Sequence, residues 1–229
     1  MVDDLIAFGL LRKTTNEDET TYAATPRGLE YLDTYWKMNG YLEAFDQTPT
    51  RGLAAIMFAD LAGYTALTQK NERHALELLE EYRTVTREVL PRFHGREVKT
   101  VGDAFLVEFS SALEASQCAV EMQRRMYERN RNVREADRLL ARIGIHIGDI
   151  ERKGSDILGD AVNIGSRVYA LAEPGGVCIT RQVFDQVWNK LGNHLTEVGK
   201  KEVKNVEFPI EVFSIDLPWD EEVTTRPRT

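Results

Sequence analysis

Two aspartates in this chain each follow or adjoin a short apolar segment and lie beside a turn of small residues. Asp103 belongs to the sequence KTVGDAFLVEF, residues 99 to 109, in which Gly102 and Asp103 are typical of a tight hairpin turn. Asp60 follows the apolar segment 54–58. Carboxylates at the ends of neighbouring strands could hold a pair of divalent metal ions, which is a common device in phosphoryl chemistry. Each aspartate could equally be an ordinary turn former.

The residues after Asp60 suggest a binding site for phosphate. A strand that ends in small residues before a helix exposes backbone N–H groups near the helix N-terminus, where anions bind. We expect this loop to contribute Leu61, Ala62, Gly63, Tyr64 and Thr65.

A third candidate is the pair Asn163 and Arg167 in the sequence DILGDAVNIGSR. Residues four apart on a helix share a face. An amide suits the positioning of a ribose, and the guanidinium fork of Arg matches phosphate oxygens. The ordinary alternative for such a pair is a solvated helix face. We expect Asp160 to be the N-cap of this helix rather than a ligand.

The elements that must position these residues alternate between strand and helix from residue 53 onward. Apolar periodicity predicts a helix over 71–90, a helix starting at 110 or 111, a helix over 160–173 and a helix starting at 181. Strands are predicted over 54–59, 96–109 as a hairpin, 142–148, 177–180, 195–199 and 207–215. Strand, helix, hairpin, helix, strand is the order of an α+β, ferredoxin-like (βαββαβ) core.

Outside this domain, which we place at residues 53–216, the sequence changes in character. Residues 1–48 indicate a hairpin with a polar tip, then a helix with Thr25 as N-cap and Pro26 as its first residue. This segment resembles the last part of a winged-helix domain; the alternative is a regulatory or dimerisation segment. Residues 49–52 are predicted to be a linker and 217–229 a polar tail.

Composition excludes several classes of protein. The 229 residues include 29 Lys and Arg against 37 Asp and Glu, a net charge of −8, which argues against non-specific nucleic-acid binding. The cysteines, Cys118 and Cys178, have no metal-ligand spacing, which favours a reducing compartment. No apolar run approaches the ~20 residues that span a membrane. We therefore expect a cytoplasmic protein without a membrane partner.

Together, four segments resemble the class III nucleotidyl cyclases over residues 53 to about 215. FADLAGYT, KTVGD, RIGIHIG and DILGDAVNIGSR occur in the order found in that family. The resemblance implies that Asp60 and Asp103 bind two Mg²⁺ or Mn²⁺ ions per active site, with the backbone carbonyl of Leu61 as a further ligand. No histidine is an obvious general base, since His94 is expected in a loop and His146 in the sheet.

The resemblance also assigns the substrate-binding residues. Lys99 and Asp156 correspond to the base-recognition pair, Asn163 to the ribose-orienting residue and Arg167 to the transition-state arginine. Lys204 corresponds to a late lysine that contacts the phosphates. A lysine that donates to N1 and an aspartate that accepts from the N6 amine fit adenine, whereas guanine presents the opposite pattern.

The implied activity is that of an adenylate cyclase, which converts ATP to 3′,5′-cyclic AMP and pyrophosphate. In this family the sites lie between two catalytic domains, so one chain with both halves implies a homodimer with two equivalent sites. The alternatives are a guanylate cyclase and a catalytically silent, nucleotide-sensing protein of the same fold.

Overall fold

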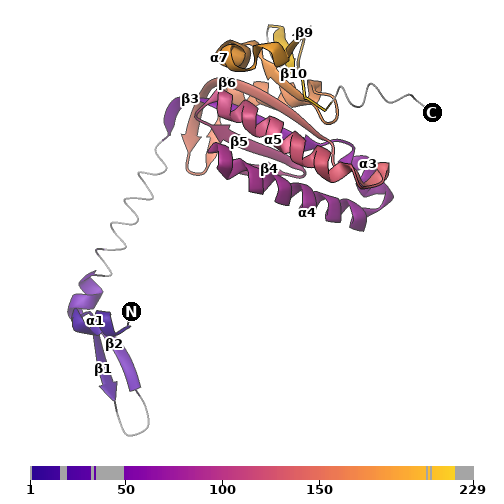
Figure 1. Ribbon diagram of the computed structural model, residues 1–229. Helices are drawn as coiled ribbons and strands as arrows, with labels where there is room; N and C mark the ends of the chain where they lie inside the picture. Colours follow the sequence, from indigo (N-terminus) through magenta and orange to yellow (C-terminus); the bar gives the residue numbers. More distant parts are fainter. Residues whose placement is uncertain are drawn as a thin grey trace. The chain divides into compact units, whose positions relative to one another are not determined.

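The chain folds into two units, Met1–Pro49 and Thr50–Thr229 (Figure 1). The computed structural model describes residues 2–15, 20–31, 34, 49–204, 206 and 208–219. Among these residues, no helix is long and apolar enough to cross a membrane.

The first unit contains the predicted hairpin and the start of the predicted helix. Helix α1 (Val2–Ala7) precedes strands β1 (Leu11–Thr15) and β2 (Thr20–Ala24), and residues 26–31 are helical. Thr25 is confirmed as the N-cap, since its Oγ1 accepts a hydrogen bond from the Gly28 N–H at 3.0 Å. The tip at 16–19 and the later apolar positions Trp36, Leu42 and Phe45 lie outside the described residues.

The second unit contains one large sheet with helices on both faces. Its strands are β3 (Thr50–Leu61), β4 (Arg96–Val101), β5 (Ala104–Phe109), β6 (Ala141–Lys153), β7 (Asp156–Leu158), β8 (Val177–Thr180), β9 (Leu195–Lys201) and β10 (Ile210–Ile215). Its α-helices are α3 (Tyr64–Lys70), α4 (Glu72–Val89), α5 (Ala112–Asn130), α6 (Asp160–Val168) and α7 (Arg181–Leu191). The short 3-10 helices are η1 (Leu90–Phe93), η2 (Glu135–Asp137), η3 (Tyr169–Leu171) and η4 (Gly192–His194).

The strand order confirms the ferredoxin-like core. The sheet runs β4-β5-β3-β6-β8-β10-β9, and β7 pairs with β6 outside this path. The first four strands are antiparallel neighbours connected through α3 and α4, a hairpin, and α5, as βαββαβ requires. Strand β8 extends this core by pairing parallel to β6.

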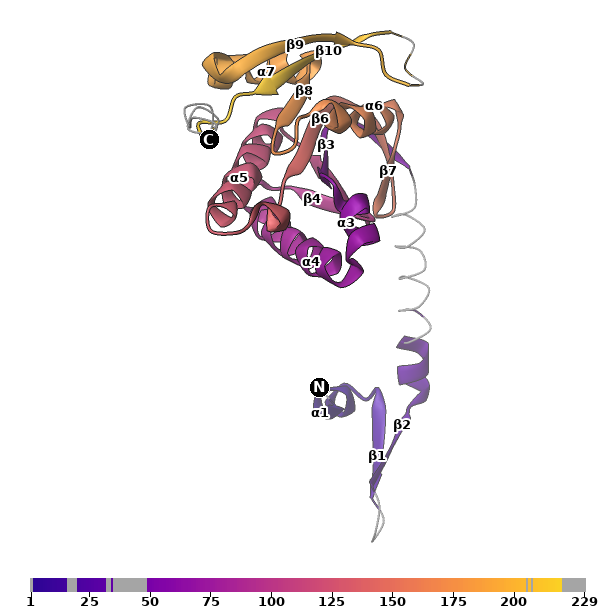
Figure 2. The same ribbon diagram turned by 90° about the vertical axis from the view of Figure 1, so that its right-hand side faces the viewer.

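Side chains on both faces of the sheet are buried, because successive residues of each strand point to opposite faces. On one face, Met57, Val107 and Ile145 pack with the helices α4, α5 and α7 in the main core. On the other face, Ile56 and Leu106 pack with β7 and α6. Figure 2 shows α4 and α5 on one side of β3 and β6, with α6 and β7 on the other side. The strands therefore carry apolar residues at consecutive positions, as expected for a sheet covered on both sides.

Helix α6 lies unusually close to the sheet because two glycines leave room for it. A Cβ on Gly144 of β6 would come within 2.1 Å of the Tyr169 backbone nitrogen. A Cβ on Gly165 of α6 would be 3.2 Å from the ring of Phe58 on β3. The rings of Phe58 and Tyr169 also stack, with centroids 6.1 Å apart. These contacts fix where the exposed face of α6 lies.

Several sequence-based boundaries are wrong. Residues 50–52 of the predicted linker begin β3, because they pair with residues 150–152 of β6. The helix predicted over 160–173 ends as α-helix at Val168 and tightens into η3. The first residues of the predicted polar tail pack on the domain: Leu217 is buried, and Trp219 stacks on Tyr127 with centroids 5.4 Å apart. Residues 220–229 lie outside the described residues.

Candidate active site

Asp60 and Asp103 meet at one end of the central strands. Asp60 is the penultimate residue of β3, and Asp103 is in the turn between β4 and β5. Strand β5 pairs with β3 so that Phe105 is opposite Ala59, which brings this turn beside the end of β3. The two carboxyl groups are close enough to share a hydrogen bond. The sequence-predicted pair therefore comes together within one chain.

The electrostatics of this pair fit a divalent cation. Burial, then the hydrogen bond with Asp103 and its negative charge, raises the pKa of Asp60 to about 7, against weaker lowering by the Leu61 N–H and Arg142. Two carboxylates in contact repel each other unless one is protonated or a cation lies between them. No group of three or more His, Cys, Asp or Glu side chains gathers anywhere in the described ranges, so the site would rest on these two carboxylates. Two carboxylates completed by waters and substrate phosphates are the usual protein site for Mg²⁺.

The predicted phosphate loop after Asp60 is only partly free to bind. Helix α3 begins at Tyr64 after Gly63, which has a φ of 78° and makes no side-chain cap. The Ala62 N–H donates to the carbonyl of Leu140 at 2.8 Å. That N–H is engaged within the chain, and the assignment of Ala62 to the phosphate loop stays a prediction. The backbone N–H groups of Gly63, Tyr64 and Thr65 lie at the start of a helix whose first N–H groups have no intrahelical partner.

Lys99 and Asp156 form an ion pair across a gap of 57 positions in sequence. The Lys99 Nζ lies 2.8 Å from Oδ1 and 2.7 Å from Oδ2 of Asp156. Asp156 Oδ1 also accepts the Ile157 N–H at 2.8 Å. The hydrogen bond from Lys99 is the largest cause lowering the pKa of Asp156. Both predicted base-reading residues therefore come together, charged, within a single chain.

A β-bulge in β4 places Lys99 on the correct face of the sheet. Glu97 pairs with Val107 and Lys99 with Leu106, so Val98 is an extra residue between them. Residues opposite each other on antiparallel strands share a face, and an extra residue shifts all later positions to the other face. Glu97 therefore faces α4, where it binds Arg87 at 2.8 and 2.9 Å, whereas Lys99 faces β7.

Asn163 and Arg167 lie on α6, as predicted, and both residues are exposed. Neither side chain forms a hydrogen bond or an ion pair with any residue that the structure describes. Arg167 lowers the pKa of Tyr169, while burial, Asp60 and Asp103 together raise it, with burial the largest cause. Helix α6 therefore offers an amide and a guanidinium that are unoccupied within the described chain.

Asp160 differs from its predicted role as a cap. Gly159 occupies the N-cap position with a φ of 134°, and Asp160 is the first residue inside α6. Asp160 is instead one of the charged groups that act on the buried His146.

The two candidate histidines have structural roles. His146 lies buried on β6, with its Nδ1 2.9 Å from the Thr180 Oγ1, and burial lowers its pKa to about 4. His94 ends η1 in the left-handed conformation with a φ of 55° and lies 2.9 Å from a carboxylate oxygen of Glu114. The structure thus has His146 in the sheet and His94 in a loop, as expected.

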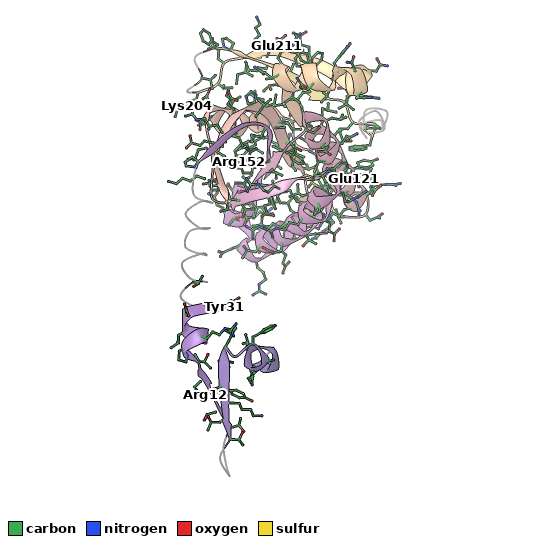
Figure 3. All side chains as sticks on the ribbon, turned by 90° about the vertical axis from the view of Figure 1, so that its left-hand side faces the viewer. Arg12, Tyr31, Glu121, Arg152, Lys204 and Glu211 are labelled. Atoms are coloured by element: carbon green, nitrogen blue, oxygen red, sulfur yellow. The ribbon has the colours of Figure 1, made fainter. Side chains whose placement is uncertain are left out.

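Lys204 lies in a segment that packs beside α6, because its neighbours Val203 and Val206 share an apolar cluster with Ile164. It is an exposed turn residue after β9 and is labelled at the rim of its unit in Figure 3. In the sheet order, β9 and β4 are opposite edges, six strand spacings apart. At about 4.8 Å per spacing this is on the order of 30 Å. Along the sheet, Lys204 is therefore far from Lys99, although its own segment packs against α6.

Two supporting arginines were missed by the sequence analysis. Arg83 of α4 donates to the carbonyl of Gly102 at 2.9 Å, and Arg96 of β4 donates to the carbonyl of Ser155, also at 2.9 Å. Each carbonyl immediately precedes a site aspartate. No spacing in the sequence connects these residues, because each pair depends on how distant elements pack.

Comparison with known proteins gives one consistent result. Residues 47–216 match the family described as adenylate and guanylate cyclase catalytic domain. The "Putative adenylate cyclase 3" of Rhizobium meliloti is 37% identical over 166 residues, which are 72% of this chain and 28% of that protein. This chain thus spans under a third of that relative.

Solved structures have the same fold. The "Adenylate/Guanylate Cyclase/Hydrolase" of Silicibacter pomeroyi aligns with a TM-score of 0.70 and 36% identity, over 74% of this chain and 99% of that one. The adenylyl cyclase CyaB of P. aeruginosa aligns with a TM-score of 0.64 and 22% identity, over 73% of this chain and 95% of that one, and supports the fold alone.

Proposed function

Since the chain belongs to the adenylate and guanylate cyclase catalytic-domain family, we propose that it is an adenylate cyclase that converts ATP to 3′,5′-cyclic AMP and pyrophosphate. The observation that carries the choice of ATP is the ion pair of Lys99 and Asp156. An ammonium group has three donors and a carboxylate about four acceptor positions, so both retain capacity for a ligand while paired. Lys99 would donate to the acceptor N1 of adenine, and Asp156 would accept from the N6 amine.

Asp60 and Asp103 would hold two divalent cations, Mg²⁺ or Mn²⁺, together with the Leu61 carbonyl and the substrate phosphates. Such ions lower the pKa of the 3′-hydroxyl and neutralise the triphosphate. The rest of the chemistry is positioning. Asn163 would orient the ribose so that its 3′-oxygen is in line with the α-phosphorus.

Arg167 would stabilise the charge that develops on the α-phosphate as the new P–O bond forms and pyrophosphate leaves. Its guanidinium is free for this role, because no described residue engages it. A preorganised donor of this kind typically contributes a factor of about 10²–10³ to the rate. Lys204 would contact the phosphates as well.

The proposed assembly is a homodimer in which the two active sites are shared. Asn163 and Arg167 are exposed and unengaged in the described chain, as a surface that completes a partner's site should be. A two-fold axis would give two equivalent sites, each with Asp60 and Asp103 from one protomer and Arg167 from the other. A monomer would then be inactive.

The test is product formation by the purified full chain. Protein at high concentration is incubated with ATP or GTP and Mn²⁺ or Mg²⁺, and the nucleotides are separated by chromatography. Cyclic AMP from ATP is the expected product. Cyclic GMP as the main product would identify a guanylate cyclase, and no cyclic product under any condition would identify a silent nucleotide-binding protein.

A further inference from the structure

We propose that Arg96, Glu108 and Arg152 form a positioning cluster that holds Lys99 against Asp156 and thereby sets the preference for adenine. This inference rests on the proposed function, which assigns Lys99 and Asp156 to the base. No hydrogen bond joins the cluster to either charged group, although the charge of Arg96 also helps to lower the pKa of Asp156. The cluster would act mainly through the backbone and strands that carry the two residues.

Glu108 is the centre of the cluster. It lies on β5 and is 7% exposed, although it is ionisable. The Arg96 Nε lies 3.0 Å from Oε2 of Glu108, and the Arg152 Nε lies 2.6 Å from Oε1. Burial would raise the pKa of Glu108, but the hydrogen bonds from both arginines outweigh it and the pKa is lowered. A single buried carboxylate therefore joins two guanidinium groups.

The cluster spans four strands of the sheet. Arg96 is on β4, next to β5, whereas Arg152 is on β6, which is separated from β5 by β3. Arg152, labelled in Figure 3, reaches Glu108 by passing over β3 at Gly52. A Cβ on Gly52 would lie only 2.8 Å from the Arg152 Nη1. Because Gly52 has no side chain, the Arg152 side chain has room to cross β3 and to connect β6 with β5.

Arg96 extends the cluster to the hairpin that carries Asp156. Its Nη1 donates to the carbonyl of Ser155 at 2.9 Å, and Ser155 is the residue before Asp156. Strand β7 pairs only with β6, yet it reaches β4 through this bond and through Lys99. The β6–β7 hairpin is thus attached to β4 at two adjacent points.

The Lys99–Asp156 pair needs this support because it is exposed. The two side chains are 44% and 42% exposed, and an exposed ion pair typically contributes only about 0–1 kcal/mol. Removing one partner of a buried, hydrogen-bonded ion pair has much larger effects than removing an exposed one. Glu108 is thus the buried anchor, and Arg96, itself 43% exposed, links it to the hairpin that holds Asp156 near Lys99.

The substitution that tests the cluster is Glu108→Gln, which removes the central charge and keeps the shape. The matched control is Glu97→Gln, which breaks the bidentate Arg87–Glu97 pair on the same hairpin but on the α4 face. Glu97 touches neither β7 nor the cluster residues in any bond that the structure describes. A second test variant is Arg96→Lys. The Arg96 side chain is 43% exposed, and its guanidinium binds Glu108 through Nε and the Ser155 carbonyl through Nη1, two directions that a compact ammonium does not span.

The kinetic measurement determines KM and kcat separately, for ATP and for GTP. In Glu108→Gln and Arg96→Lys we expect KM for ATP to rise roughly tenfold, equivalent to about 1.4 kcal/mol. The ratio of kcat/KM for ATP over GTP should fall to a similar extent, while kcat at saturating ATP stays within about twofold. Glu97→Gln should behave as wild type. Equal effects in the variants and the control, or a loss in kcat alone, would overturn the proposal.

A second readout does not need activity. Amide hydrogen exchange of a peptide covering residues 151–158 should accelerate in Glu108→Gln and Arg96→Lys but not in Glu97→Gln, measured at a temperature at which every variant is folded. Unchanged exchange in both variants would refute the cluster even in an active enzyme. Conversely, if wild type forms no cyclic nucleotide, the proposed function fails while the exchange result still decides whether the cluster positions the hairpin.

Discussion

Arg83 of α4 holds the turn that carries Asp103, by donating to the Gly102 carbonyl at 2.9 Å. The turn would otherwise be a free hairpin tip, because Gly102 has a φ of 66° and nothing lies within 4 Å of where its Cβ would be. Arg83 is itself fixed by Glu80, one turn earlier on α4, at 2.7 Å. The position of Asp103 is therefore set by a helix on one face of the sheet.

Replacing Arg83 should weaken metal binding. In Arg83→Met we expect the Mn²⁺ concentration for half-maximal activity to rise roughly tenfold, as typically happens when an outer-shell partner of a metal ligand is lost. KM for ATP at saturating Mn²⁺ should change little. Arg92→Met is the control, since it breaks an ion pair between η1 and Glu121 of α5. A rise in KM for ATP with an unchanged Mn²⁺ requirement would contradict this role of Arg83.

The raised pKa of Asp60 predicts a pH-dependent stabilisation by metal. In the metal-free protein this carboxyl binds its proton more tightly when folded than when unfolded, so its contribution to stability is present below about pH 4 and is lost as pH rises through about 7. A bound divalent cation would replace that proton. We expect Mn²⁺ to raise the melting temperature more at pH 8 than at pH 6, measured by scanning fluorimetry in the presence and absence of EDTA.

Asp103→Asn is the informative variant for this effect. It removes the negative charge beside Asp60, so the metal-free protein should melt at a higher temperature than wild type at pH 8, and Mn²⁺ should add little. Activity should fall by about 100-fold or more, since a metal ligand is lost. A Mn²⁺ effect of the same size in wild type and in Asp103→Asn would show that the ion binds elsewhere.

Mixing two inactive chains should restore activity if the sites are shared. Asp60→Ala and Arg167→Ala homodimers should each lack a complete site. After random exchange, half of the dimers are mixed, and each mixed dimer has one intact site of two, so about a quarter of wild-type activity is expected. The measurement is cyclic AMP formation after co-incubation or co-expression.

The control mixture combines Asp60→Ala with Asp103→Ala. Both substitutions affect the same metal-binding half, so each site of a mixed dimer lacks one carboxylate. We expect no recovery in this mixture. Recovery in both mixtures, or in neither, would contradict a site shared between protomers.

The donor and acceptor pattern at Lys99 and Asp156 predicts how base preference can be changed. Guanine presents a donor at N1 and an acceptor at O6, so Lys99→Glu combined with Asp156→Asn reverses both partners. The double variant should favour GTP over ATP in kcat/KM, even if the total rate is lower. The comparison is made by competition assay with both nucleotides in one mixture, and a retained preference for ATP would mean that other groups select the base.

The strands and helices of the catalytic domain were largely predictable, because their residues repeat with clear periods. Leu78, Leu79 and Tyr82 recur at helical spacing and are buried in α4, and alternate residues of β3 lie on opposite faces. The hairpin turn was also predictable, because Gly102 and Asp103 are residue types that favour tight turns. These features depend on residues close together in the sequence.

The features that could not be predicted depend on contacts between distant residues. Strict alternation would put Lys99 on the same face as Glu97, and only the bulge at Val98 reverses this. Strand β7 has three residues and becomes a strand because β6 lies beside it. The linker prediction is wrong at residues 50–52 for the same reason. Pro49 and Gly52 suggested a break in the structure, but residues 50–52 pair with β6 and so belong to β3.

Because α6 packs closely on the sheet, the substitutions that this domain can accept during evolution are limited. A single methyl group on Gly144 would meet the backbone of Tyr169 at 2.1 Å, a clash that side-chain rotation cannot relieve. Any larger residue there must lift the end of α6, and Arg167 would move with it. If Arg167 has its proposed role, a substitution at Gly144 would reduce activity by displacing α6, which offers one evolutionary route from an enzyme to a non-catalytic relative.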